Sequence, residues 1–280
     1  MMHQKDNRQM TDDNRCKTKY PIVLVHGIGY NDVDYPRYWG RIPEALTANG
    51  AKVYFGQQDG FGKVAKNAAQ LKVELDMIKE KDGYDKVNLI AHSKGGIDAR
   101  YMISELGMAG RVASLTTMAT PHRGIRTIDI FKEKSPALLS RFYGIFNTML
   151  RVDGGDVPND NSAYDQLTYD YMSIFNEYVI DAQEVYYQSF AFDMKGKFAD
   201  PALYLFYTKI KQYEGDNDGL VPVPSAKWGN FRGVYSGPDG KGVSHPAVCD
   251  GREKLTEKKG LGNISDFYVD LVSELREMGY

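Results

Sequence analysis

The stretch Val87–Gly96, with the sequence V-N-L-I-A-H-S-K-G-G, decides the fold of this chain. Its first residues have the apolar, branched character of a buried strand, and residues 97–103 continue as a helix. Ser93 therefore lies on a sharp turn between a strand and a helix. This is the arrangement of a nucleophile elbow, in which a strained turn presents a serine hydroxyl at the edge of a sheet.

The residues around Ser93 are as small as such a turn requires. Ala91 and Gly95 lie two positions before and after the serine, and Gly96 lets the following helix pack closely against the sheet. The first turn of that helix has free backbone N–H groups, which favour a developing negative charge. The pattern predicts that Ser93 attacks carbonyl carbons. The alternative is an ordinary strand-to-helix turn with a serine that faces solvent.

Length and composition indicate one globular α/β domain. The chain has 280 residues, 42% of them hydrophobic, and a net charge of −2, so nothing favours nucleic acid or an anionic membrane as a partner. It has no apolar run of about 18 residues, so we expect no transmembrane segment. The first 20 residues are polar and lack the apolar core of a signal peptide, which favours a cytoplasmic protein unless a leader has been trimmed. Its two cysteines, Cys16 and Cys249, require neither a disulfide nor a zinc site.

Strand and helix patterns alternate along the chain, which predicts a mostly parallel sheet with helices on both faces. We expect about six strands. Strand patterns occur at residues 21–25, 51–55, 86–91, 114–119, 184–190, 203–207 and 231–235, and helical patterns at 42–48, 63–80, 97–103 and 264–277.

The domain boundaries follow from the breaks in this alternation. Residues 1–19 are expected to form a mobile tail and residues 20–280 a single domain. Helical patterns and a polar loop fill residues 125–183, including an apolar stripe between Pro136 and Leu150. An insertion at this point would lie above the carboxyl ends of the strands, where the sites of α/β proteins occur.

A serine nucleophile needs a general base, usually a histidine that is oriented by a carboxylate. In α/β-hydrolases these residues follow one another in the order serine, acid, histidine. Only His245, in the loop before the last helix, follows Ser93 with a carboxylate between them. The sequence therefore predicts His245 as the base, against the alternative of a surface loop histidine. The chain has five histidines: His3, His26, His92, His122 and His245.

The candidate acids are Asp216 and Asp218, in the segment E-G-D-N-D-G-L-V-P. We favour Asp218, because Gly219 and an apolar turn follow it and can bury its carboxylate against His245. Asp216 would then cap a simple Asx turn.

An oxyanion hole needs two backbone N–H groups directed at the developing negative charge. The amide of Lys94, directly after the nucleophile, is the first candidate. The second is the amide of Ile28, in the loop after the first strand, where Gly27 allows the backbone to come close.

Four motifs together resemble the bacterial family I true lipases, and the lysine after the serine resembles the clostridial branch. They are Val23–Gly27, Ala91–Gly96, Thr120–Gly124 and Asn217–Val221, and they occur in the order that the family has. Gln166–Thr168 with Phe175 and Asn176 is similar to the family's segment that leads out of the lid.

This resemblance implies an α/β-hydrolase sheet that lacks the first two strands, with a helical lid at about 125–183. It also implies Ser93, Asp218 and His245 as the triad and Ile28 and Lys94 as oxyanion donors. Relatives often bind a structural calcium near the histidine loop. Here Asp250 is the nearest carboxylate and Asp200 a candidate partner. Since calcium needs about six oxygens, no cofactor is predicted.

The expected activity is carboxylic ester hydrolysis with lipase character, on acylglycerol or other lipid esters. A soluble short-chain esterase and an acyltransferase would use the same triad. A catalytically inactive binding protein on a hydrolase scaffold is the alternative from another class.

Overall fold

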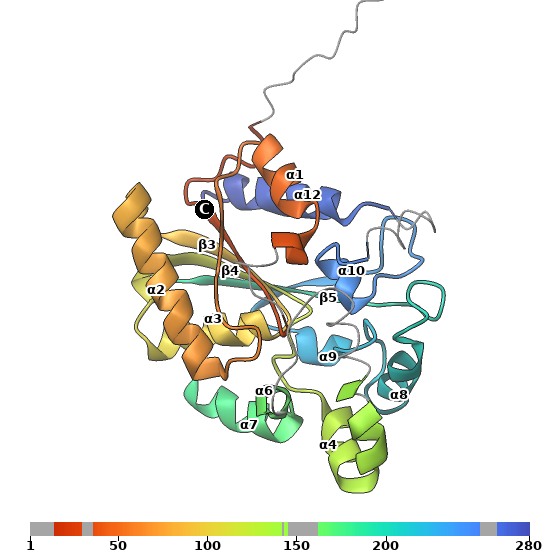
Figure 1. Cartoon of the computed structure of the whole chain (residues 1–280). Helices are drawn as coiled ribbons and strands as arrows, with labels where there is room; N and C mark the ends of the chain where they lie inside the picture. Colours follow the sequence, from red (N-terminus) through yellow and green to blue (C-terminus); the bar gives the residue numbers. More distant parts are fainter. Residues whose placement is uncertain (1–13, 30–35, 142, 145–161, 253–261) are drawn as a thin grey trace, which may run out of the picture.

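A six-stranded parallel sheet organises the fold, in the strand order β2-β1-β3-β4-β5-β6. The computed structural model describes residues 14–29, 36–141, 143–144, 162–252 and 262–280 (Figure 1). The α/β-hydrolase fold class expected from the sequence is confirmed. The strands are β1 (Ile22–Val25), β2 (Val53–Phe55), β3 (Val87–His92), β4 (Val112–Met118), β5 (Tyr186–Phe192) and β6 (Asn230–Tyr235).

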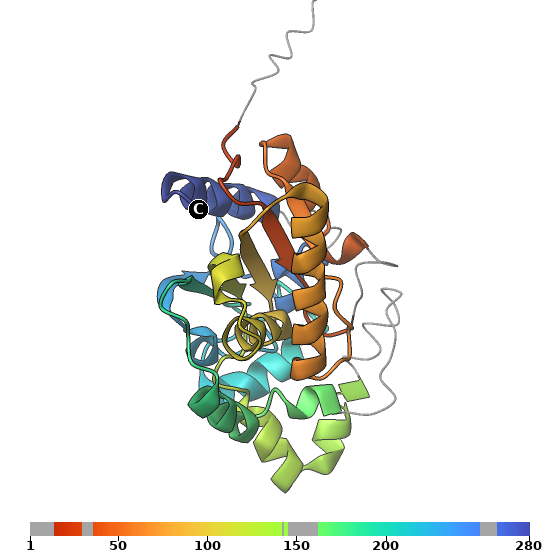
Figure 2. The ribbon, with the colours of Figure 1, turned by 90° about the vertical axis from the view of Figure 1, so that its left-hand side faces the viewer.

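Helices cover both faces of the sheet. Figure 2 shows α2 running along one face, and α3 packs beside it. The helices are α1 (Ile42–Ala48), α2 (Val64–Asp82), α3 (Lys94–Glu105), α4 (Arg126–Lys134), α6 (Ser162–Asp165), α7 (Tyr169–Tyr178), α8 (Tyr204–Glu214), α9 (Val223–Ala226), α10 (His245–Val248) and α12 (Ile264–Glu277), with 3₁₀ turns η1 (Pro36–Trp39) and η2 (Ala109–Arg111).

Strand β1 shows why its apolar run is continuous. Successive side chains of a strand point to opposite faces. Ile22 and Leu24 pack in a cluster with residues of α1 and α12, whereas Val23 and Val25 pack with residues of α2 and α3. Both faces are buried, so every position of the strand is apolar.

One expected strand is wrong. The run Leu203–Tyr207 is the N-cap and first turn of helix α8, not a strand. The buried side chains Phe206, Tyr207 and Ile210 recur at helical spacing. A short aromatic run fits either a strand or a helix, and only the longer pattern to Glu214 separates them.

The described part of the segment 125–183 is mostly helical. Helices α4, α6 and α7 lie at the end of the molecule opposite α1 and α12 (Figure 1). The start of this segment contacts the chain between α6 and α7, because the Ile125 amide donates a hydrogen bond to the Leu167 carbonyl at 2.8 Å. Residues 145–161, which include part of the apolar stripe and the polar loop, lie outside the described residues. None of the described helices has the length and apolar character that crossing a membrane requires.

Residues 14–19 are part of the domain rather than of the expected tail. Cys16 is fully buried, and its amide donates to the Asn49 carbonyl at 2.8 Å. The Lys19 amide donates to the Tyr280 carbonyl at 2.7 Å. Residues 1–13 lie outside the described residues.

Candidate active site

Ser93 lies between β3 and α3 with φ 55° and ψ −132°, a strained conformation for a residue with a side chain. The glycines after it leave room for this turn. A Cβ on Gly95 would lie 2.3 Å from the His26 carbonyl oxygen, and one on Gly96 would lie 2.3 Å from Thr120 Oγ1. The turn therefore packs directly against the end of β1 and the loop after β4.

The structure brings the three residues of the predicted triad together. His245 Nε2 lies 3.0 Å from Ser93 Oγ, and His245 Nδ1 lies 2.7 Å from Asp218 Oδ2. Ser93 is 8% exposed, His245 6% and Asp218 0%. Such a relay allows the imidazole to take the serine proton while the carboxylate holds the other ring nitrogen.

The two candidate acids lie in different surroundings. The Asp218 carboxylate is buried, and its Oδ1 accepts hydrogen bonds from the amides of Leu220 at 3.0 Å and Val221 at 2.7 Å. The Asp218 carbonyl also accepts a hydrogen bond from the His245 amide at 2.8 Å. Asp216 instead pairs with Lys211 at 3.0 Å, and its side chain is 56% exposed. The geometry therefore favours Asp218 as the partner of His245.

The two predicted oxyanion donors lie on segments that flank Ser93. Lys94 is the first residue of α3, where an amide has no partner within the helix. Ile28 is buried in the loop after β1. The preceding Gly27 lies so close to the nucleophile that a Cβ there would be 2.8 Å from Ser93 Cβ.

Among the other histidines, His92 is the one that contacts the triad. Its ring centroid lies 4.5 Å from that of His245, with an interplanar angle of 38°. Burial, and then the neighbouring His245, lowers the pKa of His92 well below its ordinary value of 6.5. His92 is therefore uncharged at neutral pH and adds no positive charge next to His245. His122 is also fully buried, in the loop after β4, and His3 lies outside the described residues.

These histidines predict a loss of stability in mild acid. Burial, and then the cations Arg100 and Arg123, lowers the pKa of His122 well below 6.5, as burial does for His92. Below pH 6.5 the unfolded chain takes up protons that the folded chain does not. The contribution of these histidines to the free energy of unfolding is therefore fully present above pH 6.5 and decreases as the pH is lowered. Each histidine contributes about 1.4 kcal/mol per pH unit. Urea unfolding at pH 6 and pH 5 gives the free energy of unfolding at each pH. Its decrease from pH 6 to pH 5 should be smaller in His122→Gln than in the wild type by about 1.4 kcal/mol. An equal decrease in both proteins would contradict the expectation.

Lys94 and Asp98 form an ion pair directly behind the nucleophile. The distances from Lys94 Nζ to the Asp98 carboxylate oxygens are 2.7 and 3.0 Å, and both side chains are 2% exposed or less. Asn67 Nδ2 donates to the same carboxylate at 2.9 Å and links α2 to α3. This pair was not predicted from the sequence, although the spacing of four residues in a helix is a recognisable signal.

The carboxylates considered for calcium are already paired with arginines. Asp250 Oδ2 accepts from Arg41 Nε at 2.8 Å, and Oδ1 accepts from Arg41 Nη2 at 2.7 Å. Asp200 Oδ2 accepts from Arg252 Nε at 3.1 Å and from Ser244 Oγ at 3.2 Å. Calcium would need these oxygens free, together with about four more. These residues do not fit calcium, and the described part of the chain holds no cluster of three or more metal-binding side chains.

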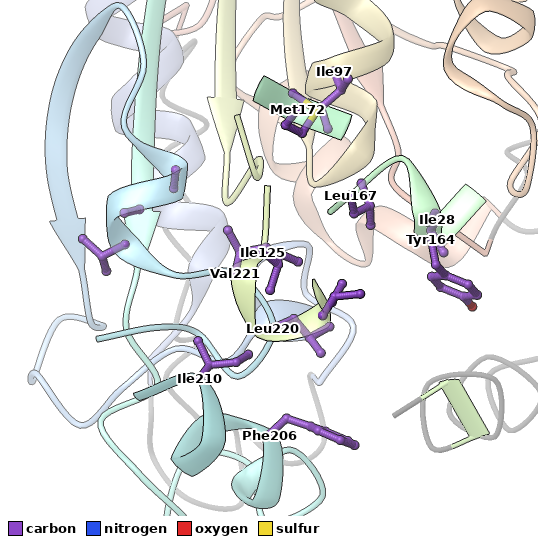
Figure 3. Packing of buried hydrophobic residues seen from close by; sticks show 14 of the residues in the cluster. Ile28, Ile97, Ile125, Tyr164, Leu167, Met172, Phe206, Ile210, Leu220 and Val221 are labelled. Atoms are coloured by element: carbon purple, nitrogen blue, oxygen red, sulfur yellow. The ribbon is translucent and has the colours of Figure 1, made fainter. Parts of the chain in front are cut away.

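The insertion contributes to a buried apolar cluster that reaches the loop after β1, which carries the predicted oxyanion donor Ile28 and is called the oxyanion loop. Ile28 belongs to this cluster, as do Tyr164 and Leu167 of the insertion and Ile97 of α3 (Figure 3). Gln166 Oε1 accepts a hydrogen bond from the Val64 amide at 2.8 Å and so ties the insertion to α2. Apolar side chains of the insertion therefore lie beside the catalytic face.

Comparison with known proteins places the chain among hydrolases. The family model described as palmitoyl protein thioesterase matches residues 21–196. Triacylglycerol lipase 2 of Saccharomyces cerevisiae is 28% identical over 291 residues, which cover 98% of this chain and 81% of the yeast protein. A triacylglycerol lipase of Pseudarthrobacter phenanthrenivorans is 32% identical over 151 residues, 49% of this chain and 47% of its own length. The match to this bacterial lipase thus spans less than half of it.

Solved structures show the same fold. The mature Bacillus licheniformis lipase BlEst2 has a TM-score of 0.68 at 22% identity, with 91% of this chain and 92% of the lipase covered. EstA from Clostridium botulinum has a TM-score of 0.67 at 18% identity, with 93% and 88% covered. At these identities the likeness establishes the arrangement of the sheet and helices.

Proposed function

This chain is a lipase/esterase-type α/β-hydrolase that belongs to the palmitoyl protein thioesterase family, and from this membership we propose its function. We propose that it hydrolyses long-chain acyl esters through an acyl-enzyme on Ser93. The observation that carries the proposal is the relay from Ser93 Oγ to His245 and Asp218, at 3.0 and 2.7 Å.

The first half of the reaction forms the acyl-enzyme. His245 Nε2 takes the proton of Ser93 Oγ as the oxygen attacks the ester carbonyl carbon. The negative charge that develops on the carbonyl oxygen is stabilised by the amides of Ile28 and Lys94. His245 then donates its proton to the leaving alcohol, and the bond between the carbonyl carbon and that alcohol breaks.

The second half repeats these steps with water. His245 takes a proton from water, the hydroxide attacks the acyl carbon, and the proton returns to Ser93 Oγ as the carboxylic acid leaves. The Asp218 carboxylate holds the Nδ1 side of the His245 ring and stabilises the imidazolium that forms twice in each cycle. Its two backbone hydrogen bonds and complete burial support this role.

A long acyl chain is supported by the apolar surroundings of the oxyanion loop. We infer that the segment from α6 to α7 covers the acyl-binding face, since Tyr164 of α6 and Met172 of α7 belong to one cluster with Ile28 and Ser93 is only 8% exposed. Displacing this cover would expose apolar side chains to a lipid. The family match favours a second candidate substrate, a palmitoyl thioester, which the same relay would cleave.

The substrate class is tested with p-nitrophenyl butyrate and p-nitrophenyl palmitate, each dissolved and emulsified. We expect palmitate to be preferred and its hydrolysis to accelerate when the ester forms an emulsion, because an apolar interface stabilises the displaced insertion. A matched pair of O-palmitoyl and S-palmitoyl substrates separates the two candidate bonds. Preference for butyrate, with no acceleration at the interface, would contradict the proposal.

A further inference from the structure

The loop that carries the predicted oxyanion donor Ile28 is held by a buried histidine that the triad does not use. His26 is fully buried at the end of β1. Its Nδ1 lies 2.7 Å from the Gly27 carbonyl oxygen, and its Nε2 lies 2.9 Å from the Gln58 carbonyl oxygen. Gln58, itself buried, returns a hydrogen bond from its Nε2 to the His26 carbonyl at 2.8 Å.

The contact with the Gly27 carbonyl matters because of peptide geometry. The Gly27 carbonyl and the Ile28 N–H belong to the same planar peptide unit, in which a trans bond points the two groups in opposite directions. Holding the carbonyl therefore fixes the direction of the N–H. The Ile28 amide donates to none of the described residues, as a role toward a substrate oxyanion requires.

The other side of Gly27 is held as well. The Gly27 amide donates to the Tyr38 hydroxyl at 2.8 Å, and this hydroxyl lies 2.5 Å from His92 Nδ1. The Tyr38 hydroxyl is therefore in contact with both the Gly27 amide and the His92 ring. Tyr38 thus joins the oxyanion loop to the residue before the nucleophile, and both peptide units that flank Gly27 are fixed.

We propose that His26 is a positioning residue for ester hydrolysis, whose Nδ1–H holds the Gly27 carbonyl and so directs the Ile28 amide at the oxyanion. This inference rests on the proposed function, since it concerns the same hole. Both ring nitrogens of His26 face carbonyl oxygens, which only accept hydrogen bonds, so the contact with Gly27 requires a proton on Nδ1.

The kinetic test uses a matched pair of substitutions, His26→Asn and His26→Leu. Asparagine and leucine have nearly the same shape, but only the asparagine amide nitrogen can donate from the position of Nδ1. We expect His26→Leu to lower kcat on a p-nitrophenyl ester about 30-fold, less than the loss of about 10²–10³-fold for removal of a whole donor, because the Ile28 amide is misdirected rather than removed. KM should stay within about threefold, and His26→Asn should keep most of kcat.

The outcomes separate positioning from a structural role. Equal losses of kcat in both variants, or a loss that falls mainly on KM, would overturn the proposal. Thermal unfolding of both variants is measured alongside, and a loss of kcat that only follows the fall in Tm also overturns it.

A second readout does not depend on activity. Nitrogen-15 NMR of the imidazole rings in the Ser93→Ala protein, with His26→Asn used to assign the resonance, reports which nitrogens of His26 are protonated. A protonated Nδ1 supports the proposal, whether or not Nε2 also carries a proton. An unprotonated Nδ1 overturns it. This measurement needs no turnover. An unprotonated Nδ1 would therefore overturn the role of His26 while ester hydrolysis by Ser93 stands, and a protein without esterase activity could still show a protonated Nδ1.

Discussion

Replacing Ser93 with alanine is expected to lower kcat for ester hydrolysis by about 10⁵–10⁶-fold, the size found when a triad serine is removed. The reason is the loss of the covalent route, since the variant lacks the hydroxyl that lies 3.0 Å from His245 Nε2 and would accept the acyl group. The fold should persist, because alanine removes a single oxygen and suits the tight turn before Gly95. The measurement is kcat on the best p-nitrophenyl ester.

Ser104→Ala is the matched control for this change. Ser104 lies on the same helix α3, and its hydroxyl donates to the Ile180 carbonyl, away from the triad. We expect near wild-type turnover from it. A fluorophosphonate probe should label the wild-type protein and Ser104→Ala but not Ser93→Ala. Turnover in Ser93→Ala within tenfold of wild type would show that another group carries the reaction.

Replacing Asp218 with asparagine is expected to lower kcat by about 10⁴-fold. The carboxylate accepts a hydrogen bond from His245 Nδ1 at 2.7 Å and so leaves Nε2 free to accept the serine proton. An asparagine amide can donate to Nδ1 instead, which stabilises the tautomer that carries its proton on Nε2. That tautomer cannot act as a base toward Ser93.

Asp216→Asn provides the control, because Asp216 lies two residues away but pairs with Lys211 at the surface. Its effect on kcat should be less than twofold. If Asp216→Asn lowered kcat as much as Asp218→Asn, the assignment of Asp218 as the acid of the relay would be contradicted. The pair therefore decides experimentally between the two candidates that the sequence left open.

The sequence predicts most where local chemistry and chain order constrain the answer. The elbow at Ser93 needs small neighbours, and the order of residues predicts His245 as the base. The bounds of α1 and α12 agree with their patterns, and in α12 the amphipathic period extends over 14 residues. The run Leu203–Tyr207 was misassigned, because five apolar residues do not distinguish a strand from a helix turn.

The sequence by itself predicted a parallel sheet, because strands that are buried on both faces require continuous apolar runs. It also predicted the residue types of the relay and their order along the chain, because the strained turn at Ser93 accepts only small neighbours. Only the tertiary structure decided which partners meet. It brought Asp218 to His245, turned His26 and Tyr38 onto the two sides of Gly27, and paired Asp200 and Asp250 with arginines. These contacts join residues from different loops, and their distances are set by how helices and strands pack rather than by any local pattern.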